Sequence, residues 1–298
     1  MTGFEAQWLA LREGADRRAR DSAIRDAAAL HFARRDEMTI VDLACGAGSN
    51  TRALAPYLCA RQSWRLVDHD AALLDSARTA LTHWADAVEG EKPLTLRKND
   101  RRLEIAFEQL DLNADLSRAL DGADLVSAAA FFDLVSAQWI EAFCAELARR
   151  RLPLYAVLTY DGKESWTPPH KADAAMLAAF HRHQARDKGF GPAAGPRAGA
   201  ILQETLELAG YAARVGSSPW RLGEGDAELT AALADGAAEA VAQTGLVEQA
   251  TIADWRAARR NASGCEIGHA DMFATPRRIA GAYPTSIRIG LDPAVGLH

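Results

Sequence analysis

Residues 39–50 read Thr-Ile-Val-Asp-Leu-Ala-Cys-Gly-Ala-Gly-Ser-Asn, and this stretch decides the fold. An apolar run that leads into a glycine turn predicts a buried strand that ends beside a ligand. Gly46 and Gly48 allow the backbone to pass close to a bound molecule, where a side chain would collide. Asp42 stands just before the turn, and its carboxylate would repel a phosphate group and attract a cationic amino group.

A dinucleotide-binding turn would place a third small residue at position 51 and would hold pyrophosphate at the helix N-terminus. This chain has Thr51 there. The next predicted strand, Trp64–Asp68, ends on an acid 20 residues beyond Gly48, where it can accept hydrogen bonds from two ribose hydroxyls. The turn and the two acids together favour a nucleoside that carries a cationic amino group, such as S-adenosylmethionine (SAM).

Residues 39–160 resemble the class I SAM-dependent methyltransferases. The resemblance implies an α/β, Rossmann-like fold: a seven-stranded, mostly parallel sheet with helices on both faces, plus helical insertions. Phe107–Leu112 is similar to the third strand and its loop, and Ala123–Ala128 is similar to the fourth strand, which delivers the loop facing the methyl group. Ala44 departs from the family pattern, because it stands where the family usually has its first glycine.

The resemblance also implies SAM as the cofactor and S-adenosylhomocysteine (SAH) as its product. The glycine loop would hold the methionine end, Asp68 would bind the ribose, and Asp111 would lie near the adenine amino group. The expected cofactor-binding residues are Asp42, Ala44, Gly46, Gly48, Asn50, Asp68, His69, Asp111, Leu112, Ala128 and Arg12.

Composition narrows the class of protein. A net charge of −6 over 298 residues, with a pI near 5.8, argues against a nucleic-acid partner. The four cysteines lie far apart in apolar stretches and predict buried thiols in a reducing compartment. No apolar run approaches the ~20 residues of a membrane span. The N-terminus lacks the pattern of a secretory signal. We therefore expect a cytoplasmic protein with a small-molecule acceptor and no metal, and homodimer formation stays open.

The chain pattern predicts one domain with insertions. Strands and helices alternate from 39 to 160, which predicts a parallel sheet with crossover helices. Asn99-Asp100 separates two short apolar–polar runs and indicates a hairpin. The expected units are an N-terminal helical cover (1–36), the methyltransferase domain (37–275) with a lid insertion (161–199) and a helical insertion (221–263), and a loosely structured tail (276–298).

Residues 4–35 show helical spacing and many interleaved charges. One interpretation is a solvated surface held by salt bridges. The other is that this helix covers the cofactor and that Arg12 or Arg20 meets the methionine carboxylate, since a guanidinium fork fits a carboxylate well.

The acceptor would lie beyond the ends of the fourth and fifth strands. Phe132 and Asp133 follow the fourth strand, and Tyr160 and Trp166 follow the fifth; they could contact or orient an acceptor. The alternative for the phenylalanine is packing under the next helix. We expect Phe132, Tyr160, Trp166 and Lys188 to bind substrate and Asp133 to take part in catalysis.

A helix predicted near residues 170–187 carries apolar residues at i, i+3, i+4, i+7 and i+8 spacing. His183 and Asp187 extend that stripe four residues apart, which would orient an imidazole as a general base. Core packing is the alternative for such a histidine. We therefore name His183, Asp187 and Asp133 as candidate catalytic residues.

These observations predict a SAM-dependent methyltransferase that acts on a small or medium-sized metabolite, at oxygen or nitrogen, under a helical lid. Two alternatives remain: a methyltransferase of RNA or another nucleic acid, and a SAM-binding protein without turnover.

Overall fold

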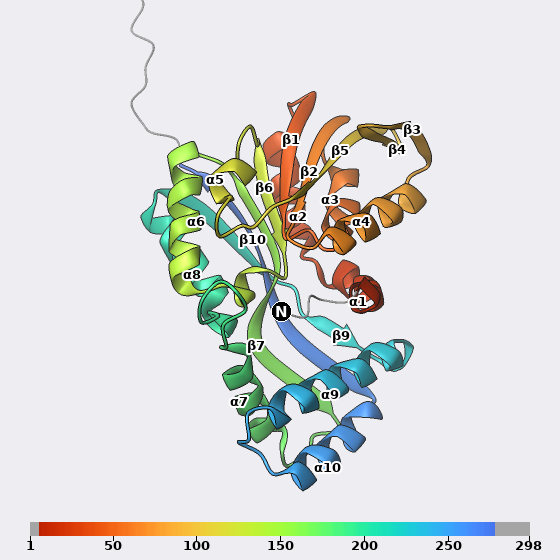
Figure 1. The fold of residues 1–298 in the computed structure, drawn as a ribbon, viewed down its shortest axis with the longest axis vertical. Helices are drawn as coiled ribbons and strands as arrows, with labels where there is room; N and C mark the ends of the chain where they lie inside the picture. The colour runs from red at the N-terminus through yellow and green to blue at the C-terminus, as the bar shows by residue number, and fades with distance from the viewer. Residues whose placement is uncertain (1–5, 278–298) are drawn as a thin grey trace, which may run out of the picture.

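The computed structural model describes residues 6–277 and builds them around one mixed sheet (Figure 1). Its main strands lie in the order β5-β2-β1-β6-β7-β10-β8, and β1 pairs in parallel with β2 and β6. Only β10 among these seven runs antiparallel to both neighbours. Their bounds are β1 Glu37–Leu43, β2 Arg61–Asp68, β5 Arg101–Gln109, β6 Leu125–Ala129, β7 Leu154–Thr167, β8 Tyr211–Ser217 and β10 Gly264–Pro276.

The expected fold class is confirmed, but the strand count was wrong: within residues 6–277 the sheet has ten strands instead of seven. The additions are β3 (Ala87–Glu91) and β4 (Leu94–Lys98) at one edge and β9 (Trp220–Leu222), which pairs with β10. The hairpin at Asn99 is present, with β4 and β5 as its arms. Because β5 is one long strand, it serves both as the second arm of that hairpin and as the neighbour of β2.

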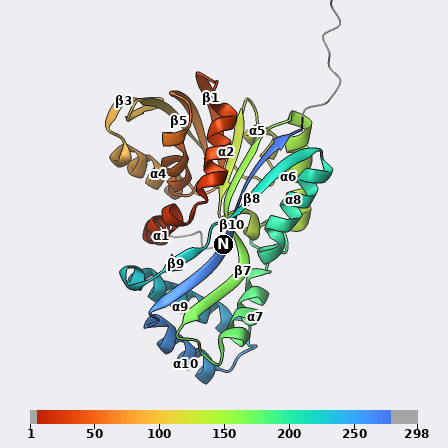
Figure 2. The ribbon, with the colours of Figure 1, turned by 180° about the vertical axis from the view of Figure 1, so that it is seen from behind.

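Helices cover both faces of the sheet because strand side chains point alternately to each side. Figure 2 shows α2 against the face opposite α6 and α8. On β1, Val41 and Leu43 belong to the core under α6 and α8, whereas Met38 and Ile40 belong to the core under α2 and α4. The covering helices are α2 Ser22–Phe32, α3 Ser49–Leu54 with the 3-10 turn η1 Ala55–Tyr57, α4 Ala71–Trp84, α5 Leu116–Ala119, α6 Ala137–Arg150 and α8 Ala198–Leu208.

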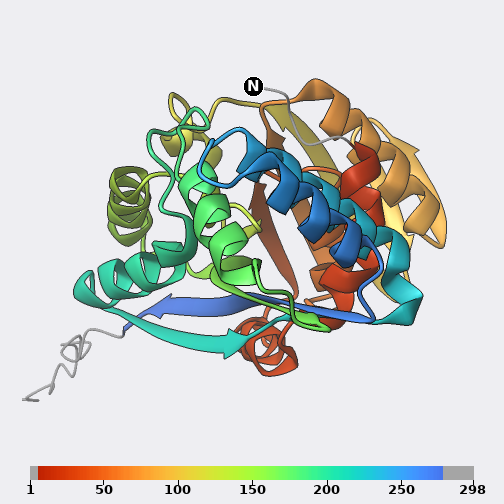
Figure 3. The ribbon, with the colours of Figure 1, turned by 90° about the horizontal axis from the view of Figure 1, so that it is seen from below.

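A helical lobe extends from the sheet on the long ends of β7 and β10 (Figures 1 and 3). It combines the two insertions expected at 161–199 and 221–263, because α7, α9 and α10 share one apolar core with these strand ends. Met176, Trp166 and Trp255 lie in this core. The lobe's helices are α7 Asp173–Gln184, α9 Ala227–Ala242 and α10 Gln249–Arg260, with the 3-10 turns η3 Gly195–Arg197 and η4 Glu224–Asp226 near their ends.

The N-terminal segment forms two helices, where the sequence suggested a continuous one. Helix α1 (Ala6–Ala19) ends before Asp21, whose side chain accepts hydrogen bonds from Ala23 N and Ile24 N and so caps α2. The chain turns there, and α2 packs on the sheet while α1 contacts β9 and α9. Residues 278–298, most of the expected tail, lie outside the described part of the chain.

The cysteines are free, as expected, and three of them are buried. Cys59 is only half-buried. No helix within residues 6–277 is both long and apolar enough to cross a membrane.

Candidate functional site

A cavity of about 590 Å³ lies at the carboxyl ends of the parallel strands, where open α/β sheets bind ligands. Its walls come from the loops after β1, β2, β5 and β6, from α1, and from residues 187–190 after α7. Its volume falls in the usual range for small-molecule sites, about 300–1,000 Å³. Eleven predicted site residues line it: Arg12, Asp42, Ala44, Gly46, Asn50, Asp68, His69, Asp111, Leu112, Asp187 and Lys188.

Asp42 is fully buried at the floor of this cavity. Its Oδ1 accepts hydrogen bonds from Asn50 Nδ2 at 2.7 Å and from Ser127 Oγ at 2.6 Å. Its Oδ2 is buried and has no partner in the described structure. Burial raises the pKa of this carboxyl, and the bonds from Ser127 and Asn50 only partly oppose that shift. A buried carboxylate with one vacant oxygen suits a cationic ligand group.

The turn after β1 takes the left-handed backbone conformation at Ala44 (φ +49°), Gly46 (φ +53°) and Gly48 (φ +74°). A side chain at Gly46 would come within 3.0 Å of Leu9 Cδ1. Gly48 does not line the cavity; it begins α3 and packs closely on Ala77. The turn therefore keeps its shape at Ala44 although alanine is strained there.

Replacing Ala44 with glycine should stabilise the protein by about 0.5–1 kcal/mol. The left-handed conformation costs a residue with a Cβ about 1–2 kcal/mol, and the greater freedom of glycine in the unfolded chain offsets part of that gain. Urea unfolding would measure the difference. Ala80→Gly, inside helix α4, is the control and should lose about 1 kcal/mol. Equal losses in both variants would contradict strain at Ala44.

Asp68 ends β2 on the other side of the glycine turn. Its Oδ2 accepts from Gly46 N at 2.9 Å, and its Oδ1 accepts from Asp70 N at 3.1 Å. His69 Nδ1 lies 3.3 Å from the same Oδ1. Each carboxylate oxygen can accept more than one hydrogen bond, so Asp68 both fixes the turn and keeps capacity for ligand hydroxyls.

The far end of the cavity is apolar. Leu73, Leu110 and Leu112 line it and are buried, which suits the face of a planar base. Asp111 stands exposed at the rim, with Oδ1 accepting from Asn113 N at 2.9 Å. This loop thus combines an apolar wall with a carboxylate at its edge.

Helix α1 covers the cavity and connects the sheet to the lobe. Leu9, Arg12 and Asp16 line the cavity from this helix. Glu13 forms a two-point ion pair with Arg52 of α3, at 2.8 and 2.6 Å. On the lobe side, Trp220 Nε1 donates to Asp16 Oδ1 at 3.0 Å.

The two arginines predicted for the methionine carboxylate are both engaged by the protein itself. Arg12 pairs with the carboxylate of Asp16, and its guanidinium lies over the Trp220 ring. Arg20 donates to Asn50 Oδ1 at 2.7 Å, and its Nε is buried without a partner in the described structure. Asp16 was not predicted as a site residue; Arg12 lies four residues before it in the same helix, but its other partner, Trp220, comes from a distant segment.

The acceptor side contains a buried polar pair that sequence reasoning found only in part. Asp133, in the 3-10 turn η2 (Phe132–Leu134), accepts from Gln184 Nε2 at 3.3 Å. Burial raises the pKa of Asp133 to about 6, against the opposing effects of its backbone, Arg12 and Lys188. Lys188 Nζ donates to the carbonyl oxygen of Gln184, and burial lowers the pKa of Lys188.

The expected pairing of His183 with Asp187 does not form. Helix α7 ends at Gln184, so the four-residue helical spacing does not extend to Asp187. His183 Nε2 instead lies 3.0 Å from Gln243 Oε1 at the end of α9. Asp187 Oδ1 accepts from Gly189 N and Gly191 N and holds the following turn.

Four other predicted residues lie in the core and not on the cavity wall. Ala128 and Phe132 are buried under α6, and the cavity is lined instead by Ala129, Ala130 and Phe131. Trp166 is in the lobe core, where its ring meets Trp255 edge-on. Tyr160 is buried in the same lobe core.

Tyr160 belongs to a polar chain that connects β7 to α7. Its hydroxyl donates to Glu164 Oε1 at 2.8 Å and lies 3.0 Å from His181 Nε2. His181 is therefore the histidine of α7 that contacts a predicted site residue.

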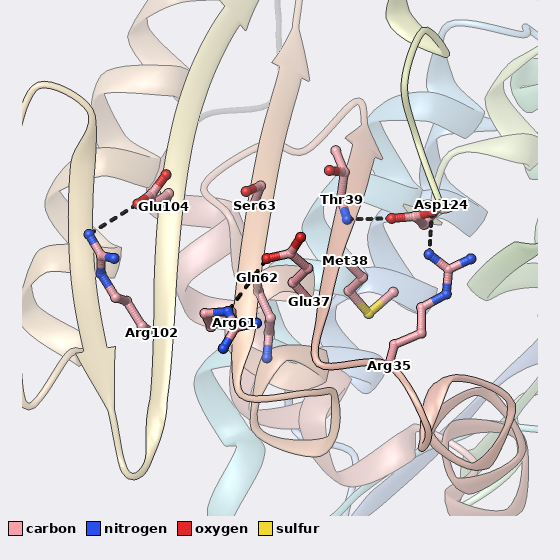
Figure 4. Close-up of a pocket in the computed structure, with 10 residues that line it drawn as sticks. All are labelled: Arg35, Glu37, Met38, Thr39, Arg61, Gln62, Ser63, Arg102, Glu104 and Asp124. Carbon is pink, nitrogen blue, oxygen red and sulfur yellow. Dashed lines mark hydrogen bonds and ion pairs between the residues drawn. The ribbon is translucent and has the colours of Figure 1, made fainter.

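A second hollow, of about 440 Å³, lies at the amino ends of β1, β2 and β5 (Figure 4). Its arginines are paired with neighbouring acids: Arg35 with Asp124 at 2.6 Å, and Arg102 with Glu104 at 3.0 Å. Because its charges satisfy one another and it lies at the end of the sheet opposite the glycine turn, we assign it no ligand. Within residues 6–277 no group of three or more His, Cys, Asp or Glu side chains could hold a metal ion.

Comparison with known proteins finds only distant structural likenesses. No protein-family model matches the chain, and no curated protein matches it. Among solved structures, YcgJ from Bacillus subtilis is similar at 12% identity with a TM-score of 0.46, covering 87% of this chain and 100% of that one. A cyclopropane-fatty-acyl-phospholipid synthase-like protein from Lactobacillus casei is similar at 15% identity with a TM-score of 0.47, covering 86% and 90%.

Magnesium protoporphyrin IX methyltransferase from Synechocystis, solved with bound SAM, is similar at 10% identity with a TM-score of 0.41, covering 91% of this chain and 80% of that one. These likenesses are weak, and they concern the fold. The chemistry therefore has to be argued from this chain's own residues.

Proposed function

We propose that this chain is a SAM-dependent methyltransferase that transfers the methyl group to a nitrogen or oxygen atom of a small or medium-sized metabolite and releases SAH. The observation that carries the proposal is the vacant Oδ2 of Asp42 at the floor of the cavity. A dinucleotide would place phosphates near this carboxylate, whereas the methionine end of SAM would place an ammonium group there.

The other walls of the cavity fit the remaining parts of SAM in order. Asp68 can accept from ribose hydroxyls, and the leucines beyond it can contact the adenine ring while Asp111 receives its amino group. Arg12, which lines the cavity, can meet the carboxylate. Bound SAM would supply an electrophilic methyl group, and the chain's part is to position the acceptor and exclude water.

A small acceptor is supported by the cover over the site. Helix α1 lines the cavity and is tied to both α3 and the lobe by the Glu13–Arg52 pair and the Asp16–Trp220 bond. A polymer would need that cover opened, and the net charge of −6 disfavours RNA. We extend the proposal to a cytoplasmic location, which the free cysteines support.

Calorimetry with SAM, SAH and NADH tests the proposal. We expect one SAM per chain, and Asp68→Ala should weaken SAM binding by about 1–3 kcal/mol through loss of charge-assisted bonds to the ribose and of support for the turn. Asp75→Ala, exposed on helix α4, is the matched control and should bind normally. Tighter binding of NADH than of SAM would overturn the proposed function, and normal SAM binding by Asp68→Ala would overturn the ribose assignment.

A second measurement separates an enzyme from a SAM-binding protein without turnover. Incubation with SAM and a cell metabolite extract should produce SAH together with a product heavier by one methylene. SAM binding without any such product would favour the alternative.

A further inference from the structure

Arg20 lies in the turn between α1 and α2, and its side chain reaches the start of α3. Its Nη1 donates to Asn50 Oδ1 at 2.7 Å. The backbone that carries Arg20 is held on both sides: Arg20 N donates to the carbonyl oxygen of Asp16 at 3.3 Å, and the next amide, Asp21 N, donates to the buried Asp271 at 2.8 Å. The turn therefore presents the guanidinium to Asn50 from a fixed place.

Asn50 connects Arg20 to the buried acid at the floor of the cavity. Asn50 is only 2% exposed, and its Nδ2 donates to Asp42 Oδ1 at 2.7 Å and to Ser127 Oγ at 3.2 Å. Ser127 Oγ in turn donates to the same Oδ1 at 2.6 Å. Both protein donors therefore reach Asp42 Oδ1, and Asp42 Oδ2 has no partner in the described structure.

The orientation of the Asn50 amide decides this arrangement. A guanidinium can only donate hydrogen bonds, so Arg20 binds the carbonyl oxygen of the amide and leaves the NH₂ group for Asp42. Without Arg20, the buried carbonyl oxygen would lose its donor, which is unfavourable. Rotation of the Asn50 side chain into the cavity, which it lines, would give that oxygen water and would break the bond to Asp42.

Arg20 can be distinguished from a residue that touches the ligand. It does not line the cavity of the described structure, although its Nε is buried without a partner there. Burial raises the pKa of Asp42, and the charge of Arg20 is among the effects that oppose this rise. By its charge alone, a nearby cation would repel the ammonium group of SAM. Weaker binding of an ammonium ligand after removal of Arg20 would therefore show an effect exerted through Asp42.

We propose that Arg20 is a positioning residue for the cofactor: it holds the Asn50 amide so that Asp42 keeps its Oδ2 for the ammonium group of SAM. This inference rests on the proposed function. Arg20 connects the joint between α1 and α2 to the cofactor-binding acid, and it acts without contact with the ligand. Binding of the methionine end therefore depends on a residue outside the cavity wall.

Three ligands distinguish this role from direct contact. SAM carries an ammonium group and a carboxylate, decarboxylated SAM keeps only the ammonium group, and methylthioadenosine lacks both. Calorimetry with the full-length protein measures each affinity. In Arg20→Met we expect the affinities for SAM and for decarboxylated SAM to fall by the same factor, about 10-fold. The affinity for methylthioadenosine should stay within about twofold, because that ligand has no group for Asp42 to bind.

Two further variants test the path through Asn50. Arg17→Met is the matched control, since Arg17 is exposed on α1, and it should bind all three ligands like the wild type. The double variant Arg20→Met/Asn50→Ala should bind SAM within about twofold of Asn50→Ala alone, because effects within one hydrogen-bond network do not add. Should Arg20→Met fail to fold, the three ligands are compared in Asn50→Ala, where equal losses for all three would overturn the proposal.

The other outcomes are equally decisive. A loss of SAM affinity with normal binding of decarboxylated SAM would overturn the proposal in favour of direct contact between Arg20 and the carboxylate. Tighter binding of both ammonium ligands would overturn it in favour of a charge effect alone. Unchanged SAM affinity in Arg20→Met, an equal loss for all three ligands, or additive losses in the double variant would overturn it too. Absence of SAM binding by the wild type would instead overturn the proposed function, on which the inference depends.

Discussion

Replacing Asp42 with asparagine should lower SAM affinity by about 2–3 kcal/mol, roughly 30- to 150-fold, and should make the ligand-free protein more stable at neutral pH. The affinity falls because the vacant Oδ2 of Asp42 would face the ammonium group of SAM, and an amide carries no charge to offset that group. Stability rises because the asparagine oxygen can still accept from Asn50 and Ser127 without a buried charge.

The direction of the stability change follows from the raised pKa of Asp42. Burial raises the pKa of Asp42 in the folded protein, so ionised Asp42 opposes folding once the pH rises through that value. The asparagine variant has no such group, and its advantage should appear at neutral pH and shrink in acid. Thermal unfolding with and without SAM would measure both effects. A variant that is less stable and binds SAM normally would show that Asp42 has only a structural role.

Asp271 provides the matched comparison, because it is also fully buried and also has a raised pKa. Its oxygens accept hydrogen bonds from Leu158 N, Ser218 Oγ and Asp21 N, at 2.8, 2.6 and 2.8 Å. An asparagine there would bring an NH₂ group against one of these donors, so Asp271→Asn should destabilise the protein and leave SAM affinity unchanged.

Asp271 and Asp42 differ in whether protein donors reach both carboxylate oxygens, and this difference distinguishes a structural acid from a ligand-binding one. Asp271 has protein donors on both oxygens, and it joins the N-terminal helices to β7 and β10. Asp42 lines the cavity and keeps its Oδ2 buried and without a partner in the described structure. Buried polar groups are normally satisfied within the protein, so a vacant oxygen at a cavity indicates the part that a ligand completes.

The cofactor end of the site could be predicted from local sequence. Asp42, the glycine turn and Asp68 lie within two adjacent strands and their loops, and parallel strands bring their carboxyl ends to one edge of the sheet. The long alternation of strands and helices likewise predicted the order of most elements. The extra strand β3 was missed because its residues are mostly exposed, and β9 because it is only three residues long.

The acceptor end could not be predicted in the same way, because its contacts join distant segments. Gln184 reaches Asp133 across 51 residues, and Trp220 reaches Asp16 across 204. Helical spacing predicted that Asp187 orients His183 as a general base. Helix α7 ends at Gln184, so residues beyond it do not follow the four-residue helical spacing. The apolar stripe predicted for this helix was correct in part, because Met176 and Ala179 lie in the lobe core.

Asp133→Asn should stabilise the ligand-free protein by about 2–3 kcal/mol at pH 8. The pKa of Asp133 is raised from 3.8 to about 6, mainly by burial, and each pKa unit corresponds to about 1.4 kcal/mol. Arg12, Lys188 and the Tyr160 backbone act in the opposite direction and are included in that value.

The stability difference between Asp133→Asn and the wild type should depend on pH. The protonated form of Asp133 favours folding below pH 4, and that contribution is lost as the pH rises through about 6. The variant's advantage should therefore be near zero at pH 4, grow between pH 4 and 6, and stay constant above. Urea unfolding at several pH values would measure it, with Asp100→Asn as the exposed control. An advantage independent of pH would show that folding does not shift the pKa of Asp133, and an advantage that keeps growing above pH 6 would show that the folded protein holds this carboxyl protonated to higher pH.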